Sequence, residues 1–240
     1  MLNFEYVKLD IVDSTNDYLI RDLENNRITK DKIVVARMQT NGHGTNGRTF
    51  MSAKDFGIYF TLLHIYSNET ELKFLTQKVA VAVYLTFKKI FNVEFSIKWV
   101  NDLYFNNKKI CGILCKNLIK YKAVLIGIGI DLFKNDNVEK DLKNVVGYIF
   151  ENKQDLLRNL DNKSKLLNES ELKRNIYSDF ASINNKIVLD ESNIWEPDHL
   201  VYEIVFNIYD LIKVEGLPSL YIEKNIVKDS KVYEDCYLEC

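Results

Sequence analysis

The feature that most constrains the fold is a glycine loop, TNGHGTNGRTF (residues 40–50), which lies between two predicted strands. It contains GHGTNG, a formal match to the dinucleotide-binding pattern G-x-G-x-x-G. A dinucleotide loop leaves a strand and opens a helix, because the helix N-terminus holds the pyrophosphate. Here an apolar, β-branched strand (33–38) leads into the loop, and a second apolar strand (57–65) follows it. The stretch FMSAKDF between them is too short for a crossover helix, so the sequence argues against a Rossmann-type NAD site.

The order of the remaining elements predicts an α+β fold. A strand is expected at 4–9, followed by a helix for which Ser14 or Thr15 is the N-cap. A long helix is expected over 71–91, with Asn68 and Glu71 in a capping-box pattern at its start. Three or four strands follow within 94–132, the middle pair joined by an Asn106-Asn107 hairpin turn. Strands in hairpins with interspersed helices indicate a mixed or antiparallel sheet flanked by helices.

The last third of the chain is less informative. Residues 135–192 are rich in Asn, Lys and Leu and are locally helical in pattern, notably over 166–180. A further helix is predicted over 197–214, followed by GLPSLYIEK (216–224). Neither a Pro/Ser-rich linker nor an internal repeat indicates a domain break in the first two-thirds.

Composition excludes several classes of protein. The net charge of −2 provides no general attraction to nucleic acid or to an anionic membrane. No apolar run approaches the roughly 20 residues of a membrane span, and the N-terminus lacks a signal-peptide pattern. The spacing of Cys111, Cys115, Cys236 and Cys240, with only three histidines, does not favour structural zinc. We therefore expect a reduced, cytoplasmic protein that binds neither nucleic acid nor membrane.

Three stretches carry residues suited to anion chemistry. In the glycine loop, His43 and Arg48 can reach a phosphate or carboxylate, although the loop also reads as an ordinary solvated turn. In SIKWVNDLYFNNKKICGIL (96–114), the hairpin predicts that Lys98, Asp102 and Lys109 converge at one sheet edge. A carboxylate beside lysines can hold Mg²⁺ on a nucleoside triphosphate, but charged turns are also common on solvated surfaces. In GIGID (127–131) the glycines either serve a site or simply allow close strand packing.

Together these stretches resemble the ordered motif set of the biotin–protein ligases. That family shows STN, then GRGRxGR with an aromatic, then KWPNDL, K-x-x-GIL and GIN. The present chain has DSTN (13–16), QTNGHGTNGR (39–48), KWVNDLY (98–104), KKICGIL (108–114) and GIGID in the same order. The resemblance covers about residues 3–132, with weaker agreement through GLPSL (216–220). It implies a class II synthetase-like biotin/lipoate ligase catalytic domain over 1–225 and a truncated remnant of a small C-terminal β-domain over 226–240. A DNA-binding winged helix before the first strand is not expected.

The resemblance also implies a ligase reaction in two steps. ATP and biotin give biotinyl-5′-AMP with Mg²⁺, and the biotinyl group then passes to a lysine of a biotin carboxyl carrier protein. The expected catalytic residues are Lys109, Arg48, Lys98 and Asp102, with Asp102 nearest the metal. The residues expected at biotin are Ser14, Thr15, Asn16, Gln39, Gly42, His43, Gly44, Thr45, Lys109 and Gly112. Those expected at ATP are Arg48, Phe50, Lys98, Trp99, Asn101, Asp102, Lys109 and Asp131.

Several positions depart from the family motifs. His43, Thr45 and Asn46 stand where arginines commonly stand, and of the loop arginines only Arg48 remains. Fewer cations over the adenylate predict weaker retention of this intermediate. Val100 replaces a proline, Cys111 a glycine and Asp131 an asparagine. The Asp131 carboxylate either faces the metal as well or repels phosphate.

Two alternatives to biotin ligation stay open. A lipoate–protein ligase-like acyltransferase shares the implied fold and chemistry, whereas the loss of loop arginines would also suit a degenerate biotin-binding module without catalysis. An exposed apolar sheet edge would permit a homodimer.

Overall fold

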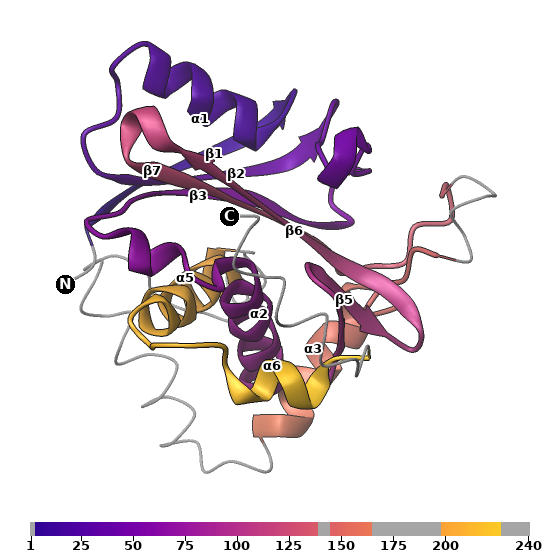
Figure 1. Cartoon of the computed structure of the whole chain (residues 1–240). Coiled ribbons are helices and arrows are strands. Elements are labelled where there is room, and N and C mark those ends of the chain that lie inside the picture. The colour runs from indigo at the N-terminus through magenta and orange to yellow at the C-terminus, as the bar shows by residue number, and fades with distance from the viewer. Residues whose placement is uncertain (1–2, 139–144, 165–197, 227–240) are drawn as a thin grey trace.

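The computed structural model describes residues 3–138, 145–164 and 198–226 (Figure 1). Its centre is a seven-stranded sheet in the order β1-β2-β3-β7-β6-β5-β4. β1 and β2 pair in parallel and the other neighbours pair antiparallel, so the sheet is mixed, as the sequence predicts. The strands are β1 (Phe4–Val12), β2 (Asp31–Gln39), β3 (Gly57–Ile65), β4 (Ser96–Lys98), β5 (Asp102–Phe105), β6 (Lys108–Leu118) and β7 (Ala123–Asp131).

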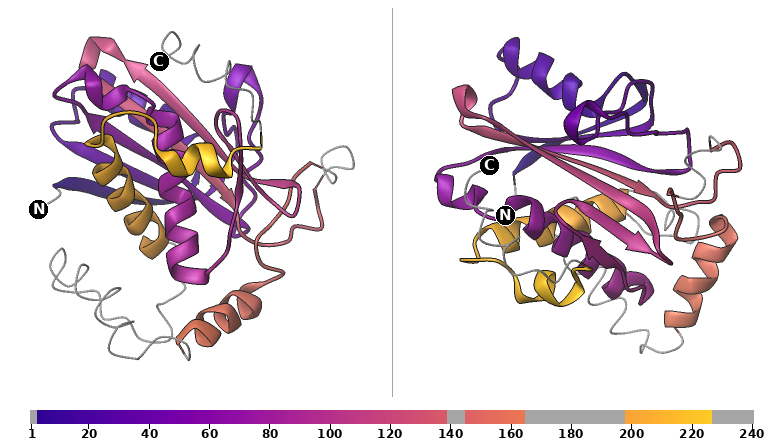
Figure 2. Two further views of the ribbon diagram at one scale, coloured as in Figure 1. Left: turned by 60° about the horizontal axis from the view of Figure 1, so that its bottom comes forward. Right: turned by 45° about the vertical axis from the view of Figure 1, so that its right-hand side comes forward.

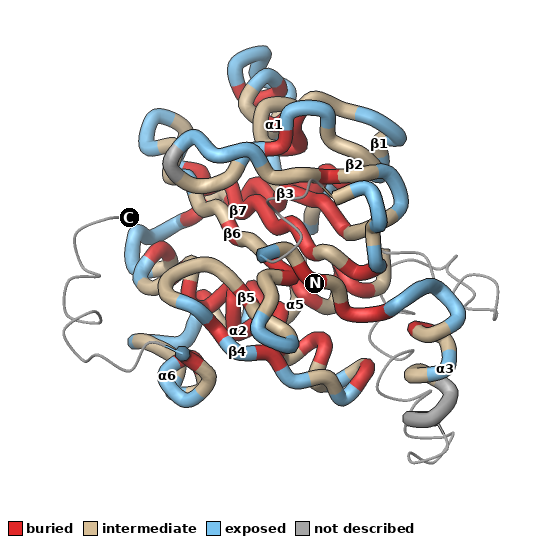
Figure 3. The backbone as a smooth tube through the Cα atoms, turned by 90° about the vertical axis from the view of Figure 1, so that its right-hand side faces the viewer, coloured by how far each residue is buried: buried red, intermediate tan, exposed pale blue. Residues whose placement is uncertain are grey.

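Helices cover both faces of the central strands. α1 packs on one face through Leu19 and Leu23, whereas α2 and α5 pack on the other (Figures 1 and 2). β3 is consequently buried along almost its whole length, and the buried residues of the sheet gather on β3 and β7 (Figure 3). The helices are α1 (Thr15–Glu24), α2 (Leu75–Phe91), α3 (Lys153–Ser164), α5 (Asp198–Ile212) and α6 (Ser219–Lys224), with 3₁₀ turns η1 (Thr45–Gly47), η2 (Glu69–Leu72) and η3 (Ile119–Tyr121).

The local turn and cap predictions are confirmed. Ser14 is the N-cap of α1, and its side chain accepts a hydrogen bond from the Asp17 backbone N–H. Asn106 and Asn107 both have positive φ, 50° and 61°, as a two-residue hairpin turn requires. This hairpin joins β5 to β6 and brings Asp102 opposite Gly112 in the register. The pairing of β6 with β7 then places GIGID beside that hairpin.

The predicted start of the long helix is wrong. The capping box of Asn68 and Glu71 exists, but it caps η2, and α2 begins only at Leu75. Phe74 interrupts the helix with a left-handed backbone (φ 56°). Glu71 is meanwhile held by His64 on β3, 2.9 Å from its Oε2. The contact between His64 and Glu71 thus keeps η2 separate from α2, although local propensity alone would join them into one helix.

Two sequence predictions fall outside the described residues. They are the helical pattern over 166–180 and the small-domain remnant beyond residue 226. None of the helices in the described ranges is both long and apolar enough to cross a membrane.

Candidate active site

A cavity of about 40 Å³ lies where the glycine loop meets the N-terminus of α1 and the strands β3, β6 and β7. Gly127 and Gly129 of GIGID line it, together with Phe60 and Thr61 of β3. Of the residues predicted for biotin, those that line it are Thr15, Asn16, Gln39, His43, Gly44, Thr45, Lys109 and Gly112. Of those predicted for ATP, Phe50, Asn101 and Lys109 line it. Residues of all five motifs therefore meet at one place.

A chain of polar side chains is fixed at one end of this cavity. The backbone N–H and Oγ1 of Thr15 both donate to Gln39 Oε1, at 2.9 and 3.0 Å, and Gln39 Nε2 donates to Ser52 Oγ at 2.7 Å. Thr61 Oγ1 lies 2.8 Å from Thr15 Oγ1 and donates to Asn16 Oδ1 at 2.9 Å. These contacts set the orientation of an amide and two hydroxyls at the cavity wall, so a polar ligand ring would meet preoriented partners.

Sequence reasoning missed Thr61 and Ser52. Thr61 is the polar residue in the middle of the otherwise apolar GIYFTLLHI strand, and it is fully buried. A buried hydroxyl needs a hydrogen-bond partner, so this interruption of the apolar run was the available signal.

Two predicted biotin residues do not line the cavity. Ser14 is fully buried as the cap of α1. Gly42 instead shapes the loop, because a Cβ there would lie 2.4 Å from the Phe50 carbonyl oxygen. Within the loop, the Phe50 N–H donates to the Gly42 carbonyl at 2.8 Å and the Gly44 N–H to that of Arg48 at 2.7 Å. Both residues support the site from behind, and a direct ligand contact by either stays a prediction.

The ring of Phe50 packs directly on the glycines of the sheet. A Cβ on Gly129 would come within 2.3 Å of Phe50 Cε1, and one on Gly112 within 3.0 Å of Cε2. A Cβ on Gly127 would lie 2.9 Å from Asn16 Nδ2. The glycines of GIGID thus allow side chains to lie flat against β7, rather than strands to pack more closely.

Lys109 is the cation of the cavity. Its Nζ lies 2.7 Å from Asp102 Oδ1, across the β5–β6 hairpin, and about a quarter of each side chain is exposed. The predicted convergence of Asp102 and Lys109 is therefore correct. Lys98 pairs in register with Asp102, but its Nζ lies over the Tyr104 ring, 5.5 Å from the centroid, and it does not line the cavity.

A second, larger cavity of about 360 Å³ lies at the Asp131 end of β7. Asp131, Tyr59, Lys108 and Lys134 are among the residues that line it. The Tyr59 ring lies edge-to-face with Phe50 of the smaller cavity, at 6.3 Å between centroids, so this aromatic pair connects the linings of the two cavities. Burial raises the pKa of the Asp131 carboxyl to about 8, while the charge of Lys109 opposes this shift. Asp131 therefore belongs to the larger cavity, and its carboxyl is held toward the neutral form.

Three other predicted ATP residues lie outside both cavities. Arg48 is exposed on the glycine loop, and Asp102 reaches the smaller cavity only through Lys109. Trp99 packs edge-to-face on Tyr221 of α6, at 6.2 Å between ring centroids, and it precedes a cis peptide bond to Val100. Asn101, which lines the smaller cavity, also donates its Nδ2–H to the Ile113 carbonyl at 2.9 Å. Part of KWVNDLY thus serves to hold the strand-to-strand turn in place.

A resident metal centre is not evident in this region. The described ranges contain no cluster of three or more His, Cys, Asp or Glu side chains placed to hold a metal ion. Mg²⁺ needs only one or two carboxylates when phosphate oxygens supply its other ligands. A metal-binding role for Asp102 therefore stays a prediction.

Comparison with known proteins identifies the family of the chain. The family model described as "Biotin/lipoate A/B protein ligase family" matches residues 9–132, which include all five motifs. The bifunctional ligase/repressor BirA of Bacillus spizizenii is 32% identical over 143 residues, covering 57% of this chain and 43% of that protein. The Escherichia coli protein of the same name is 25% identical over 128 residues, covering 52% and 39%. The chain thus matches less than half the length of these curated relatives.

Solved structures share the fold. The biotin protein ligase from Aquifex aeolicus in complex with biotin and ATP superposes with a TM-score of 0.58 and 21% identity, covering 91% of this chain and 74% of that one. The biotin protein ligase from Leishmania major in complex with biotin gives 0.61 and 21%, covering 91% and 79%. At this identity the likeness establishes the α+β architecture alone. With the family model matching more than half of its length, the chain belongs to the biotin/lipoate A/B protein ligase family.

Proposed function

We propose that this protein is a ligase that joins biotin to a lysine of a biotin carboxyl carrier protein, through biotinyl-5′-AMP made from ATP. The observation that carries the proposal is the position of Lys109, which lines the smaller cavity while the neighbouring Lys108 lines the larger one. One cavity offers a preoriented amide and hydroxyls, and the other offers cations and an aromatic ring. Two anionic substrates can then meet at a fixed ammonium group.

We assign the smaller cavity to biotin and the larger one to the nucleotide. The ureido group of biotin has two N–H donors and one carbonyl acceptor, and it needs partners when it leaves water. Gln39, Thr15 and Asn16 supply both kinds of partner at the cavity wall. Pockets for ligands of this size generally measure about 300–1,000 Å³, so a cavity of about 40 Å³ must widen. Movement of the Phe50 ring away from Gly129 would open it.

The first chemical step is an attack of a biotin carboxylate oxygen on the α-phosphorus of ATP, with pyrophosphate as the leaving group. Repulsion between the two anions opposes this approach, and the ammonium of Lys109 offsets it. Asp102 supports this role because its Oδ1 lies 2.7 Å from Lys109 Nζ and fixes the position of that amine at the hairpin. In the second step the carrier lysine, as the free amine, attacks the acyl carbon and displaces AMP. Mg²⁺ bound to the triphosphate would neutralise phosphate charge, with Asp102 as its candidate carboxylate ligand.

The lipoate alternative is less well supported by the cavity wall. The dithiolane ring of lipoate has no hydrogen-bonding N–H or carbonyl group. Bound against Thr15, Gln39 and Asn16, it would make no hydrogen bond to these polar side chains, whereas the ureido group of biotin can. The polar chain therefore favours biotin.

Exchange of radiolabelled pyrophosphate into ATP tests the proposed function. Exchange should require biotin and Mg²⁺ and should not occur with lipoate. Exchange with lipoate alone would establish the acyltransferase alternative. Tight binding of biotin without exchange would identify a binding module that lacks catalysis.

Thr45→Arg should slow release of the adenylate about tenfold to a hundredfold, because an added charge-assisted contact is worth about 1.5–3 kcal/mol. Thr45 lines the biotin cavity and stands where the family motif commonly has arginine. Release can be followed by rapid filtration after one turnover without acceptor. Thr40→Arg adds the same charge to an exposed residue of the loop outside the cavity, and it should release adenylate at the unsubstituted rate. Equal rates for both variants would show that loop charge does not control retention.

A further inference from the structure

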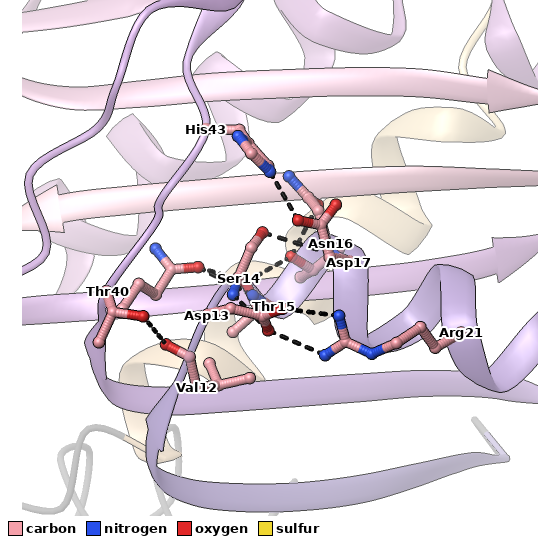
Figure 4. Close-up of polar contacts among 11 residues, drawn as sticks. Val12, Asp13, Ser14, Thr15, Asn16, Asp17, Arg21, Thr40 and His43 are labelled. Atoms are coloured by element: carbon pink, nitrogen blue, oxygen red, sulfur yellow. Dashed lines mark hydrogen bonds and ion pairs between the residues drawn. The ribbon is translucent and has the colours of Figure 1, made fainter.

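A fully buried hydroxyl connects β3 to the start of α1. Thr61 Oγ1 lies 2.8 Å from Thr15 Oγ1 and 2.9 Å from Asn16 Oδ1. Thr15 and Asn16 are the first two residues of α1, beside the Ser14 cap (Figure 4). We call Thr15, Asn16 and Thr61 the Thr61 cluster, and all three residues line the smaller cavity. Thr61 is the member that belongs to none of the five sequence motifs.

The backbone N–H of Thr15 fixes the direction of the hydrogen bonds in this wall. A backbone N–H can only donate, so the Gln39 atom 2.9 Å from it is the carbonyl oxygen Oε1. The Thr15 hydroxyl, 3.0 Å from the same Oε1, must then donate its only proton to it. Gln39 Nε2 donates to Ser52 Oγ at 2.7 Å, and the Ser52 hydroxyl donates in turn to the Phe50 carbonyl at 3.2 Å. The proton of the Thr15 hydroxyl is therefore committed to Gln39 and is not available to Thr61.

Thr61 has one hydroxyl proton for two contacts. When it donates to Asn16 Oδ1, the 2.8 Å contact with Thr15 Oγ1 joins two oxygens that have no proton between them. If the Asn16 amide turned over, Nδ2 would donate to Thr61 and Thr61 to Thr15, but Oδ1 would then have no donor among the described residues. Either end of the amide fits over Gly127, since a Cβ there would lie 2.9 Å from Nδ2 and 3.0 Å from Oδ1. Both arrangements leave one acceptor oxygen of the cluster without a proton.

The two basic side chains that line the cavity already have carboxylate partners. His43 Nε2 lies 2.6 Å from Asp17 Oδ2 (Figure 4), and Lys109 Nζ lies 2.7 Å from Asp102 Oδ1. Within the described ranges, no hydrogen bond brings a further donor to the Thr61 cluster. Water can supply the missing proton to an open cavity, but a bound ligand displaces that water and has to replace its hydrogen bond.

We propose that Thr61 is a positioning residue, which fixes the hydrogen-bond pattern of the Thr61 cluster and thereby makes the smaller cavity select ligands that donate an N–H. The identity of biotin as that ligand rests on the proposed function, and each nitrogen of its ureido group carries such an N–H. A ligand with an oxygen or a sulfur at the same place would bring a second acceptor to an oxygen that has no proton. A site that hydrogen-bonds an N–H in this way discriminates strongly against analogues that lack it.

A pair of ring fragments tests the selection without assuming that biotin binds. Imidazolidin-2-one has the ureido group with two N–H donors, whereas ethylene carbonate has ring oxygens in their place. In NMR titrations of the full chain, imidazolidin-2-one should shift the Thr61 methyl resonance and bind about tenfold to a hundredfold more tightly than ethylene carbonate. Equal affinity for the two fragments, or no binding of imidazolidin-2-one, would overturn the inference.

Thr61→Val keeps the shape of the side chain but removes the hydroxyl. The Asn16 amide is then free to present either Nδ2 or Oδ1 to a ligand. The preference for dethiobiotin over its cyclic carbonate analogue, measured by calorimetry, should fall from about tenfold to a hundredfold in the unsubstituted chain to about threefold or less. Thr61→Ser retains the hydroxyl and should retain the preference. A merely structural role would weaken both ligands equally, and an unchanged ratio in Thr61→Val would contradict the inference.

Thr86→Val is the matched control. Thr86 is also fully buried, and its hydroxyl donates to the Ala82 carbonyl and accepts from Asn207 of α5, both at 2.9 Å. It lines neither cavity, so the variant should keep the preference for dethiobiotin. Selection between the fragments by a chain that binds neither biotin nor dethiobiotin would refute the proposed ligand and support the role of Thr61. Tight binding of biotin with an unchanged ratio in Thr61→Val would do the reverse.

Discussion

Lys109→Met is expected to reduce biotin-dependent pyrophosphate exchange about a hundredfold to a thousandfold, the range found when one preorganised charge-stabilising group is removed. The ammonium group offsets repulsion between carboxylate and α-phosphate, and methionine keeps much of the side-chain volume without the charge. The change also removes the partner of Asp102, which lies 2.7 Å away. Because Lys109 opposes the raised pKa of Asp131, that carboxyl should become still harder to ionise.

Lys116→Met is the matched control for this prediction. Lys116 lies on the same strand, β6, but is exposed and lines neither cavity. Its replacement should change the rate of pyrophosphate exchange by no more than about twofold relative to the unsubstituted chain, as for most surface substitutions. Thermal unfolding of both variants separates loss of chemistry from loss of fold. If Lys109→Met catalysed pyrophosphate exchange as fast as Lys116→Met does, the proposed mechanism would lose its central support.

His64→Leu is expected to destabilise the fold by about 3–5 kcal/mol near pH 6, because it breaks a buried charge network. His64 is only 8% exposed, and its Nδ1 and Nε2 lie 2.6 Å from Asp31 Oδ2 and 2.9 Å from Glu71 Oε2. The Tyr209 hydroxyl of α5 also donates to Asp31. The network thus links β2, β3, η2 and α5 at the end of the sheet away from the glycine loop. Leucine would leave two carboxylates facing one another without a cation.

The stability lost in His64→Leu should be larger at low pH than at high pH. Burial by itself would lower the pKa of His64, but hydrogen bonds and charge from Asp31 and Glu71 raise it above its usual value. The stability that His64 contributes is therefore complete below the unfolded pKa of about 6.5 and is lost as pH rises through the folded pKa. Burial would raise the pKa of Glu71, but hydrogen bonds from His64, Asn68 and Ser67 lower it. Its contribution is present above the unfolded pKa of about 4.3 and is lost as pH falls through the folded value.

Urea unfolding near pH 6 and near pH 9 measures this effect. The difference in free energy of unfolding between the unsubstituted chain and His64→Leu should be larger at the lower pH. His43→Leu removes a more exposed histidine with a single carboxylate partner, and it should cost no more than about 1 kcal/mol. An identical loss for His64→Leu at both pH values would mean that packing, rather than charge, accounts for the effect.

Features that depend on a few neighbouring residues were predictable. The Ser14 cap, the Asn106-Asn107 turn and the exclusion of a Rossmann crossover each follow from short-range backbone geometry. The meeting of Asp102 with Lys109 was predictable for a related reason, because one hairpin turn sets their strand pairing. Local hydrogen bonds and sterics act at these positions with little help from the rest of the fold.

Features that depend on packing between distant segments were not predictable from local patterns. Lys98 carries the same charge as Lys109, yet its amine lies over Tyr104, and Trp99 packs on Tyr221 rather than in a cavity. The long helix starts late because β3 holds Glu71 through His64. Strand alternation and turn residues do not indicate which distant side chain a given residue will contact.

The sequence by itself determined the family, the mixed α+β architecture and the motif segments that could reach a common site. Only the tertiary structure decided that Thr61 and Ser52 complete the polar wall, that Asp131 belongs to a second cavity, and that Asp17 pairs with His43 of the loop. The physical reason is that apolar periodicity and turn residues act over a few positions, whereas a cavity wall is set by how sheet register and helix packing bring remote side chains together.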